Sequence, residues 1–389
     1  MRDVAIIGAG PIGNYVGYLL ATAGLDVVLL EEHAVVGEPA HCTGIIGMDA
    51  FEQFDLPRNA VVGELKKVKI ISPHRKIFDY DFDTSQALVV DRSKFDRGIA
   101  QMAILNGAQL MMDATATGIE VLKDRVDIKI RKDGRIKRIA AKMAVISTGL
   151  HYGLQERLGM GKPRDFLKCA QVETDVMDRN DYVEVYFGKR LAPGSFAWVV
   201  PIETGNGPRA RIGLSSTQSA SAYLDKFLVS LNSRVLNAEH LDVKRSAIPL
   251  TPIARTFHNR VLAVGDAAGV VKPSTGGGVF YGLICAGIAA EVVKKAFKIG
   301  RFDQRVLSEY ERQWKKRLGL ELKIGYYFRR VASKFTDAQL NDLFEVITSD
   351  EVLPLLRRKA KFDWHKDLML SIVKQAAVRN LFFGSLMKM

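Results

Sequence analysis

Short apolar runs and a helical spacing of apolar residues open the chain. The runs Val4–Ile7 and Val27–Leu30 predict two buried strands, and the apolar pattern that follows Gly13 predicts a helix between them. Two buried strands joined by a helix form a β-α-β unit, whose strands are parallel. We therefore expect an α/β fold that starts within the first few residues.

The turn between the first strand and the helix reads G-A-G-P-I-G over residues 8–13. In this spacing Gly8 permits a tight turn, Gly10 lets backbone N–H groups approach a pyrophosphate, and Gly13 lets the helix lie close to the strand. Pro11 suits the first helical turn, because the N–H that proline lacks is one that the helix does not use. The helix N-terminus then offers unpaired donors to phosphates.

The second strand ends on two acidic residues, Glu31 and Glu32. An acid at this position accepts the hydroxyls of an adenosine ribose, which favours FAD or NAD over NADP. A glycine pattern alone can mark an ordinary turn, but here the strand, helix and terminal acid are all present. The N-terminal unit is therefore predicted to bind an adenine dinucleotide.

The middle of the chain is rich in segments that alternate like strands. Asp133-Gly134 marks a hairpin between two of them, Val126–Arg131 and Arg135–Ala140, and Met143–Ser147 is an apolar strand expected to rejoin the first sheet. The other predicted strands are Lys66–Ser72, Lys76–Phe82, Ala87–Val90, Cys169–Asp175, Tyr182–Phe187, Phe196–Pro201, Ala210–Ser215 and Val243–Leu250.

A strand at Arg260–Val264 and a long apolar helix from Gly278 to about Phe297 return to the nucleotide fold, and everything after Phe302 is predicted helical. The fold class is therefore α/β (α+β): a Rossmann-like domain is interrupted by an antiparallel sheet and followed by a helical region. We assign 1–65, 85–168 and 255–300 to the nucleotide domain, 66–84 and 169–254 to a substrate domain, and 301–389 to the helical region.

Composition excludes several classes of protein. The 389 residues are 48% hydrophobic and 25% charged, as in ordinary globular proteins. The three cysteines are too few and too widely spaced for a disulfide framework or a metal site, so a cytoplasmic setting is expected. The net charge is +13, which is consistent with an anionic partner or with a solvated basic surface. No nucleic acid is expected, because no nucleic-acid-binding module is recognisable.

Four stretches together carry a resemblance to a known family. A second glycine turn, Val264–Gly269, is followed by the turn Pro273–Gly278, and the loop Gly37–Gly44 holds a cysteine. The segment Pro193–Pro201 has the spacing aromatic-x-Trp-x-x-Pro. With the N-terminal unit, these stretches resemble the geranylgeranyl reductase family, which includes the digeranylgeranylglycerophospholipid reductases, within the aromatic-hydroxylase type of FAD-dependent oxidoreductases.

The resemblance implies an FAD-dependent reductase that saturates C=C bonds of isoprenoid chains of membrane lipids or their precursors. It implies an isoprenoid lipid substrate and an electron donor, which is NAD(P)H, ferredoxin or another reductant. The implied cofactor-binding residues are Gly8, Gly10, Pro11, Ile12, Gly13, Glu31, Glu32, Cys42, Gly44, Arg92, Gly265, Asp266, Pro273, Gly276, Gly277 and Gly278.

Cys42 is the residue for which we expect a catalytic role. Reduction of an isolated alkene needs a hydride from reduced flavin N5 and a proton for the other carbon. We expect Cys42 to supply that proton from apolar surroundings, which keep a thiol protonated. On residue type alone, a buried structural cysteine is the alternative, and the resemblance favours the proton donor.

The residues implied to bind substrate lie on two of the predicted strands. Phe196 and Trp198 share one face of a strand, which by default means core packing. The resemblance instead makes them, with Pro201, walls of a prenyl channel. Tyr186 is expected in the same chamber, although the sequence alone does not decide its orientation.

Other functions stay open at this point. An FAD monooxygenase or a quinone-linked electron-transfer dehydrogenase are the alternative enzymes, and a flavoprotein that only binds a partner is a third class. Related hydroxylases usually carry Ala-Asp-Gly where this chain has Ser147-Thr148-Gly149, which weighs against the monooxygenase.

The helical region combines basic residues with apolar stripes. Its last 89 residues hold 18 Lys and Arg against 11 Asp and Glu. The apolar stripes include Leu368, Ile372, Val373 and the run Leu381–Phe383. Such a pattern predicts either peripheral contact with an anionic membrane or a helical cap whose stripe is buried against the body.

Overall fold

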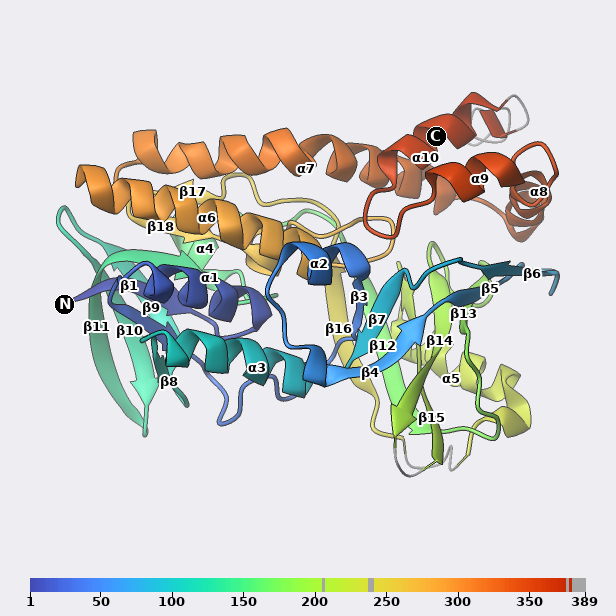
Figure 1. Ribbon diagram of the computed structural model, residues 1–389, viewed down its shortest axis with the longest axis horizontal. Helices are drawn as coiled ribbons and strands as arrows, with labels where there is room; N and C mark the ends of the chain where they lie inside the picture. The colour runs from blue at the N-terminus through green and yellow to red at the C-terminus, as the bar shows by residue number, and fades with distance from the viewer. Residues whose placement is uncertain (205–206, 237–240, 376–377, 380–389) are drawn as a thin grey trace.

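The computed structural model describes residues 1–204, 207–236, 241–375 and 378–379. Figure 1 shows one sheet at the left, a second at the lower right and a long helix across the top of both. The N-terminus lies at the left edge and the C-terminal helices at the upper right. The fold class is α/β (α+β), as predicted, with a helical C-terminal region.

The first sheet has eight strands in the order β17-β18-β11-β1-β2-β8, with β9 and β10 attached beside β11. Its central pairs, β1 with β2 and β11, and β11 with β18, are parallel. The strands are β1 (Arg2–Ile7), β2 (Val27–Leu30), β8 (Gln109–Met111), β9 (Thr115–Val121), β10 (Val126–Lys132), β11 (Arg135–Ile146), β17 (Phe257–His258) and β18 (Val261–Ala263).

Strand β11 joins two of the predicted strands into one. Its first half pairs antiparallel with β10 around the Asp133-Gly134 turn, and its second half pairs parallel with β1. Burial explains the change in its sequence pattern, because the first four residues are exposed and the last four are fully buried. The sequence shows two patterns here, while the backbone forms a single strand.

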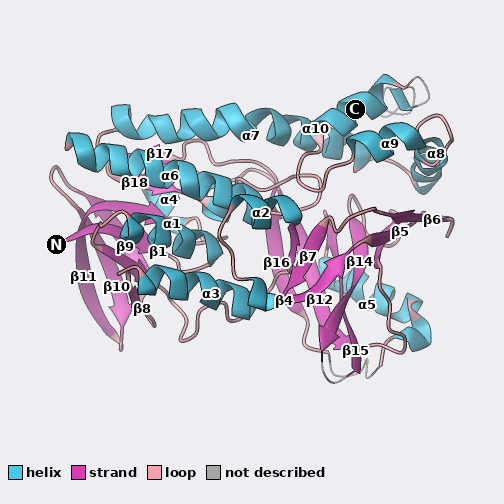
Figure 2. Cartoon of the chain, viewed as in Figure 1, coloured by secondary structure: helices cyan, strands magenta, loops and turns pink. Residues whose placement is uncertain are grey.

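Helices cover this sheet (Figure 2). α1 (Pro11–Thr22) packs against α3 (Arg92–Leu105) and α6 (Val279–Ile299), and α6 in turn packs against α7 (Gln304–Ala332). α1 buries Val16 and Leu20 against the sheet, and α4 (Gly153–Arg157) lies beside β9. The N-terminal β-α-β unit forms as predicted.

The second sheet has seven strands in the order β16-β12-β15-β14-β13-β5-β6, and α5 (Ala220–Ser230) covers one face with Leu224 and Phe227. All its pairs are antiparallel except β13 with β5. The strands are β5 (Lys67–Ile71), β6 (Ile77–Asp81), β12 (Phe166–Asp175), β13 (Val183–Phe187), β14 (Phe196–Thr204), β15 (Gly207–Ser216) and β16 (Lys244–Pro249).

A third sheet of three strands was not predicted. It consists of β3 (Ile45–Gly47), β7 (Ala87–Val90) and β4 (Val61–Leu65), and a short helix α2 (Met48–Gln53) follows β3. No strand is predicted over residues 45–47, because three residues are too few to show an alternating pattern. β4 also contacts β14 of the second sheet, and β3 contacts α6, which covers the first sheet.

The helical region begins with α7, whose Asp303 side chain caps the N-terminus. Trp314 and Tyr310 fix α7 to the first sheet: Trp314 Nε1 donates to Thr256 Oγ1 at 2.9 Å, and the Tyr310 hydroxyl donates to the Ala263 carbonyl at 3.0 Å. The remaining helices are α8 (Asp337–Ile347), α9 (Leu353–Lys359) and α10 (Lys366–Lys374).

The described part of the predicted apolar stripe packs within the helical region, against α7 and α8. Ile372, with Leu368 and Val373 beside it, packs in a cluster with Phe335 and Val378. The run 381–383 lies outside the described residues. Across the described part of the chain, every helix is too short or too polar to cross a membrane.

Two glycines of the N-terminal turn provide a test of packing. A Cβ on Gly13 would lie 2.0 Å from the Gly8 carbonyl oxygen, whereas a Cβ on Gly10 would meet nothing within 4 Å. We expect Gly13→Ala to lower the free energy of unfolding of the ligand-free protein by about 1–3 kcal/mol, because the helix must move off the strand. Gly10→Ala should change it by less than about 0.5 kcal/mol. Denaturant unfolding measures both, and equal losses would contradict the packing argument.

Candidate active site

A cavity of about 1630 Å³ lies where the two large sheets meet the helical region. Its walls come from the carboxyl ends of β1 and β2, from the loop that carries Cys42, from the second sheet and from α7 to α10. Clefts between packed layers, at the ends of parallel strands, are where ligands of such folds bind. The candidate active site is this cavity.

The N-terminus of α1 forms one end of the cavity. Gly8, Gly10, Pro11 and Ile12 line it, and no side chain caps the first amides of the helix. The backbone at Gly8 has φ of 99°, a conformation that glycine adopts without strain. Because a Cβ on Gly10 would enter open space, the turn leaves room for a phosphate beside the helix dipole.

The two acids after β2 differ in their surroundings. Glu31 is 8% exposed, and its Oε2 accepts the Ala9 N–H at 2.9 Å while its Oε1 accepts the His33 N–H at 3.0 Å. Glu32 also lines the cavity and has a more exposed side chain. Glu31 therefore fixes the glycine turn, and its predicted contact with a ribose stays a prediction.

Arg92 begins α3 and faces the cavity. Its Nε and Nη2 donate to the two carboxylate oxygens of Asp96 at 3.1 and 3.0 Å. Burial acts to lower the pKa of Arg92, but Asp96 and the nearby Cys42 sulfur raise it more, so the guanidinium stays charged. A fixed cation is thereby held beside the cysteine.

The second glycine turn brings Asp266 to the same cavity. Burial raises the pKa of Asp266, and Arg92 acts in the opposite direction. Each glycine of the 276–278 turn has its own close neighbour: a Cβ would lie 2.4 Å from Ile248 Cδ1 at Gly276, 2.6 Å from Lys272 Cε at Gly277 and 2.6 Å from Asp266 Oδ1 at Gly278. All three line the cavity with their backbone.

Three predicted cofactor ligands do not line the cavity. Gly13 faces the Gly8 carbonyl, and Gly265 gives room to Ile12, whose Cγ1 would be 3.2 Å from an added Cβ. Pro273 packs toward Gly325 of α7. These three residues pack behind the turns that line the cavity. The sequence motif therefore also includes residues that determine the conformation of the turns.

Cys42 lies at the cavity with an exposed side chain. Its sulfur accepts the Gly44 N–H at 3.4 Å, and Gly44, with φ of 82°, also lines the cavity. The expectation of apolar surroundings for the thiol is therefore wrong, because the charged Arg92 interacts with the sulfur.

The predicted substrate residues divide between the two faces of the second sheet. Phe196 and Trp198 line the cavity, with ring centroids 5.9 Å apart. Tyr186 does not, because it pairs in register with Ala197 and so lies on the opposite face from Trp198. Its ring contacts Phe227 of α5, and its hydroxyl donates to Glu184 at 2.6 Å.

Pro201 is also absent from the wall of this cavity. It lies three residues after Trp198, so the alternation of a strand turns it to the opposite face. Pro201 lines a separate cavity of about 810 Å³. Neither Tyr186 nor Pro201 lines the cavity as predicted: the prediction for Pro201 follows a motif without regard to strand alternation, and the orientation of Tyr186 depends on a register that the sequence does not reveal.

Sequence analysis missed the part of the site that comes from the helical region. Lys272 Nζ contacts Asp363 Oδ1 at 2.5 Å, and their side chains are 4% and 2% exposed. Next to them, His365 Nδ1 lies 2.6 Å from Ser274 Oγ. Arg329 of α7 donates to the Gly194 carbonyl at 2.8 Å, and burial lowers its pKa to about 10. Lys272, Arg329, Asp363 and His365 all line the cavity, yet no motif marks them.

The burial of His365 generates a testable pH dependence. Burial, helped by Lys272, lowers the pKa of His365 to about 4. Between about pH 4 and 6.5 the unfolded chain therefore binds a proton that the folded chain excludes, and this contribution to stability is lost as the pH falls through that window. We expect His365→Asn to take up about one proton fewer on unfolding in that window.

The measurement is the free energy of unfolding of both proteins from pH 4 to pH 7. Comparison with the variant separates His365 from the buried carboxyl groups, whose raised pKa values give the opposite slope. Parallel curves for the two proteins would contradict the assignment. His258, which is exposed in β17, provides the control variant His258→Asn.

The donor set fits an FAD cofactor on structural grounds. Open helix amides and a glycine turn suit a pyrophosphate, the 276–278 backbone leaves a surface without side chains, and Arg92 supplies a cation between them. Open amides at a helix N-terminus and a glycine turn are the features that bind the pyrophosphate of an adenine dinucleotide.

Comparison with known proteins agrees with this site. Residues 1–284 match the family model described as FAD binding domain. The chain is 32% identical over 359 residues to a digeranylgeranylglycerophospholipid reductase of Methanocaldococcus jannaschii, covering 89% of this chain and 90% of that one. It is 28% identical over 372 residues to digeranylgeranylglycerophospholipid reductase 2 of Methanothermobacter thermautotrophicus, covering 90% and 92%.

Solved structures show the same fold. A geranylgeranyl bacteriochlorophyll reductase-like protein of Thermoplasma acidophilum matches with a TM-score of 0.84 at 20% identity, over 98% of both chains. A p-nitrophenol 4-monooxygenase of Pseudomonas putida matches with a TM-score of 0.70 at 17% identity, over 92% of this chain and 97% of that one. The family match, the curated relatives and the FAD-shaped site together show that the chain is a flavin-dependent oxidoreductase of the geranylgeranyl reductase family.

Proposed function

We propose that this protein uses FAD to saturate C=C bonds in isoprenoid chains of membrane lipids or their precursors. One observation carries the proposal: the cavity lined by the 276–278 turn, Cys42 and Trp198 is also lined by a large set of apolar side chains, which we call the apolar branch. A hydroxylase for a small aromatic substrate needs no such branch. The names of the curated relatives support the same substrate class.

The apolar branch has the chemistry that binds a long hydrocarbon chain. It lies between the β5, β6 and β13 side of the second sheet and the helices α8 and α9. Burial of apolar surface is the interaction available to a prenyl chain, and each buried CH₂ contributes about 0.8 kcal/mol. The side chains that form the branch are Val68, Ile70, Phe78, Phe82, Val183, Val185, Phe187, Leu340, Leu343, Phe344, Ile347 and Leu356.

The residues around Cys42 suit protonation of an alkene carbon. Reduced FAD supplies the hydride when bound, and the second carbon needs a proton from the chain. The Cys42 thiol faces the cavity, and Arg92 beside it can stabilise the thiolate left after proton transfer. A proton from solvent then restores the thiol. Phe196 and Trp198 form the wall against which the alkene would lie.

Removal of the thiol tests this role. We expect Cys42→Ala to lower the rate of chain saturation about 10²- to 10⁴-fold, the usual contribution of a positioned proton donor. FAD content and reversible bleaching of the flavin by dithionite should not change. Mass spectrometry of a geranylgeranyl lipid measures the gain of two hydrogens per double bond. Cys285→Ala, at a cysteine buried in α6, is the control, and wild-type rates in Cys42→Ala would disprove the role.

The same experiment separates the alternative enzymes. A monooxygenase would yield a hydroxylated product and consume oxygen with the substrate, and a quinone-linked dehydrogenase would pass electrons to a quinone instead. The electron donor is identified by the reductant, NAD(P)H or ferredoxin, that bleaches the flavin under anaerobic conditions.

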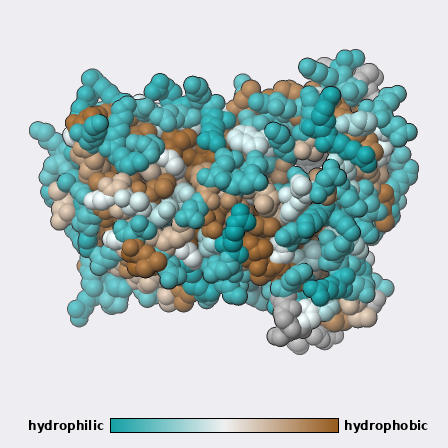
Figure 3. All heavy atoms as spheres, in the orientation of Figure 1, coloured by the Kyte–Doolittle hydropathy of each residue, from teal (hydrophilic) through white to brown (hydrophobic). Residues whose placement is uncertain are grey.

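We also propose that the lipid reaches the apolar branch from an anionic membrane surface. Arg357 and Arg358 are exposed on α9, next to the branch, and Arg357 acts electrostatically on Tyr80 of β6. Figure 3 shows hydrophobic patches between the hydrophilic residues on this face. Basic residues at such a rim attract anionic lipid, at about 1 kcal/mol each near the surface.

Flotation with anionic vesicles tests the membrane proposal. Reversal of charge in Arg357→Glu with Arg358→Glu should lower the bound fraction several-fold at low salt, because two attractive contacts become repulsive. The matched control, Arg131→Glu with Arg135→Glu, makes the same change in net charge on exposed residues of the distant β10–β11 hairpin. Equal loss in both variants would indicate a response to net charge alone and would contradict a docking site at α9.

A further inference from the structure

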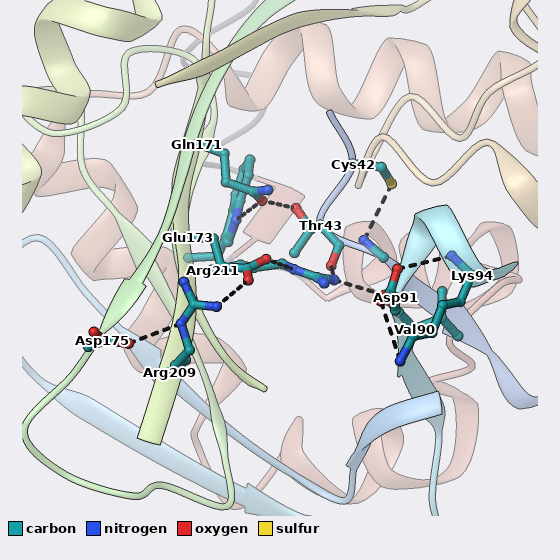
Figure 4. Close-up of polar contacts among 12 residues, drawn as sticks. Cys42, Thr43, Val90, Asp91, Lys94, Gln171, Glu173, Asp175, Arg209 and Arg211 are labelled. Atoms are coloured by element: carbon teal, nitrogen blue, oxygen red, sulfur yellow. Dashed lines mark hydrogen bonds and ion pairs between the residues drawn. The ribbon is translucent and has the colours of Figure 1, made fainter. Parts of the chain in front are cut away.

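The loop that carries Cys42 is held from behind by a buried arginine of the second sheet (Figure 4). Arg211 of β15 is 8% exposed, and its Nη1 donates to the Thr43 carbonyl at 2.7 Å and to the Val90 carbonyl at 2.8 Å. Its Nε donates to Glu173 of β12 at 3.0 Å. One guanidinium therefore joins the cysteine loop, the end of β7 and the second sheet.

A second contact links the loop to the substrate wall. Gln171 of β12 is 6% exposed, and its Oε1 accepts the Thr43 hydroxyl at 2.6 Å and the indole N–H of Trp198 at 3.2 Å. A single amide oxygen thus fixes the residue next to Cys42 and the aromatic ring that lines the cavity. Figure 4 shows Gln171 and Arg211 approaching Thr43 from the same strand layer.

The backbone next to the sulfur fits closely around the guanidinium. Gly44 has φ of 82°, and an added Cβ would lie 2.4 Å from the Val90 carbonyl oxygen and 2.6 Å from Arg211 Nη1. The N–H of the same glycine donates to the Cys42 sulfur. The position of the sulfur therefore depends on a backbone that Arg211 holds in place.

We propose that Arg211 and Gln171 are positioning residues that set the place of the Cys42 thiol relative to the substrate wall. The expected effect on catalysis rests on the proposed function, whereas the structural link between these residues and the cysteine loop does not. Neither residue acts on the alkene: Arg211 reaches the loop through backbone carbonyls, and Gln171 reaches it through Thr43. A donor that is misplaced by about 1 Å can cost about 100-fold in rate.

Glu173 neutralises the charge of Arg211, and a second arginine, Arg209, shares the same carboxylate. Glu173 accepts from Arg211 through Oε2 and from Arg209 through Oε1, both at 3.0 Å. Arg209 also pairs with Asp175 at 3.0 Å, and its contacts stay within the second sheet. Arg209 thus shares the carboxylate but does not contact the cysteine loop, which makes it a matched control.

The experiment compares Arg211→Met and Gln171→Leu with Arg209→Met in the FAD-loaded protein. The first readout is the reaction rate of Cys42 with dithiodipyridine, and this measurement needs no lipid. The rate reports on Cys42 because Cys169 and Cys285 are buried. We expect Arg211→Met and Gln171→Leu to change this rate at least about threefold, because the exposed sulfur shifts relative to the charged Arg92 that interacts with it. Arg209→Met should leave it at the wild-type value.

The second readout is saturation of the geranylgeranyl lipid. We expect kcat to fall about 10- to 100-fold in Arg211→Met and Gln171→Leu. KM should change little in Arg211→Met, because the contacts of Arg211 are with the loop, Val90 and Glu173 and not with Trp198. Arg211→Lys keeps the charge but cannot serve three acceptors with one planar fork, so its rates should resemble those of Arg211→Met.

The outcomes separate the inference from the proposed function. Wild-type thiol reactivity in both loop variants, or equal effects in Arg209→Met, would overturn the positioning role. If Arg211→Met fails to fold, Gln171→Leu carries the same test. Suppose that the wild type fails to saturate the lipid while the thiol reactivity of the two loop variants differs from the wild-type value as expected. In that case the proposed function fails and the structural link stands.

Discussion

The parallel register of one sheet governs the whole structure. Strands β18, β11, β1 and β2 end at the same edge, although they come from residues 2–30, 135–146 and 261–263. Each strand delivers a short turn to that edge: the 8–13 glycine turn, the 147–149 turn, the acids after β2 and the Asp266 turn. Because a parallel sheet places equivalent ends side by side, these distant segments line one cavity.

The turns meet because glycines let their backbones pack closely against each other. Gly8 and Gly13 allow α1 to touch the end of β11, where a Cβ on Gly8 would lie 2.3 Å from the Ser147 carbonyl oxygen. Gly47 shows the same principle beside the helical region, since a Cβ there would lie 1.9 Å from Asp363 Oδ2. The helical region can therefore reach Lys272 only because β3 ends in glycine.

The sequence predicts what depends on local pattern. The β-α-β unit, the Asp266 turn and the cysteine loop each combine residue types within about 30 positions or fewer, and the structure brings all three to one cavity. Strand register and distant pairing leave no such pattern. Tyr186 and Trp198 occupy similar aromatic positions on neighbouring strands, yet a register of Tyr186 with Ala197 turns them to opposite faces.

The buried ion pair of Lys272 and Asp363 is a case that only the structure reveals. Its partners are separated by 91 residues, and neither stands in a motif. Asp363 Oδ2 has no hydrogen-bond partner among the described residues, so burial raises the pKa of this carboxyl while Lys272 acts against the rise. A pair of this kind adds little net stability, but the loss of either partner leaves a buried charge, which favours a single arrangement of the helical region over the site.

The division of the cavity into a charged end and an apolar branch explains why its connecting residues matter. At the charged end, Arg92 and Lys272 are fixed by carboxylates, while the branch offers only hydrocarbon. Cys42 and Trp198 lie where the two parts meet, and Gln171 bonds both the cysteine loop and the indole. A chain that displaced the indole would strain the same amide that holds the loop. The position of the cysteine loop and that of the indole are thereby linked through one buried side chain.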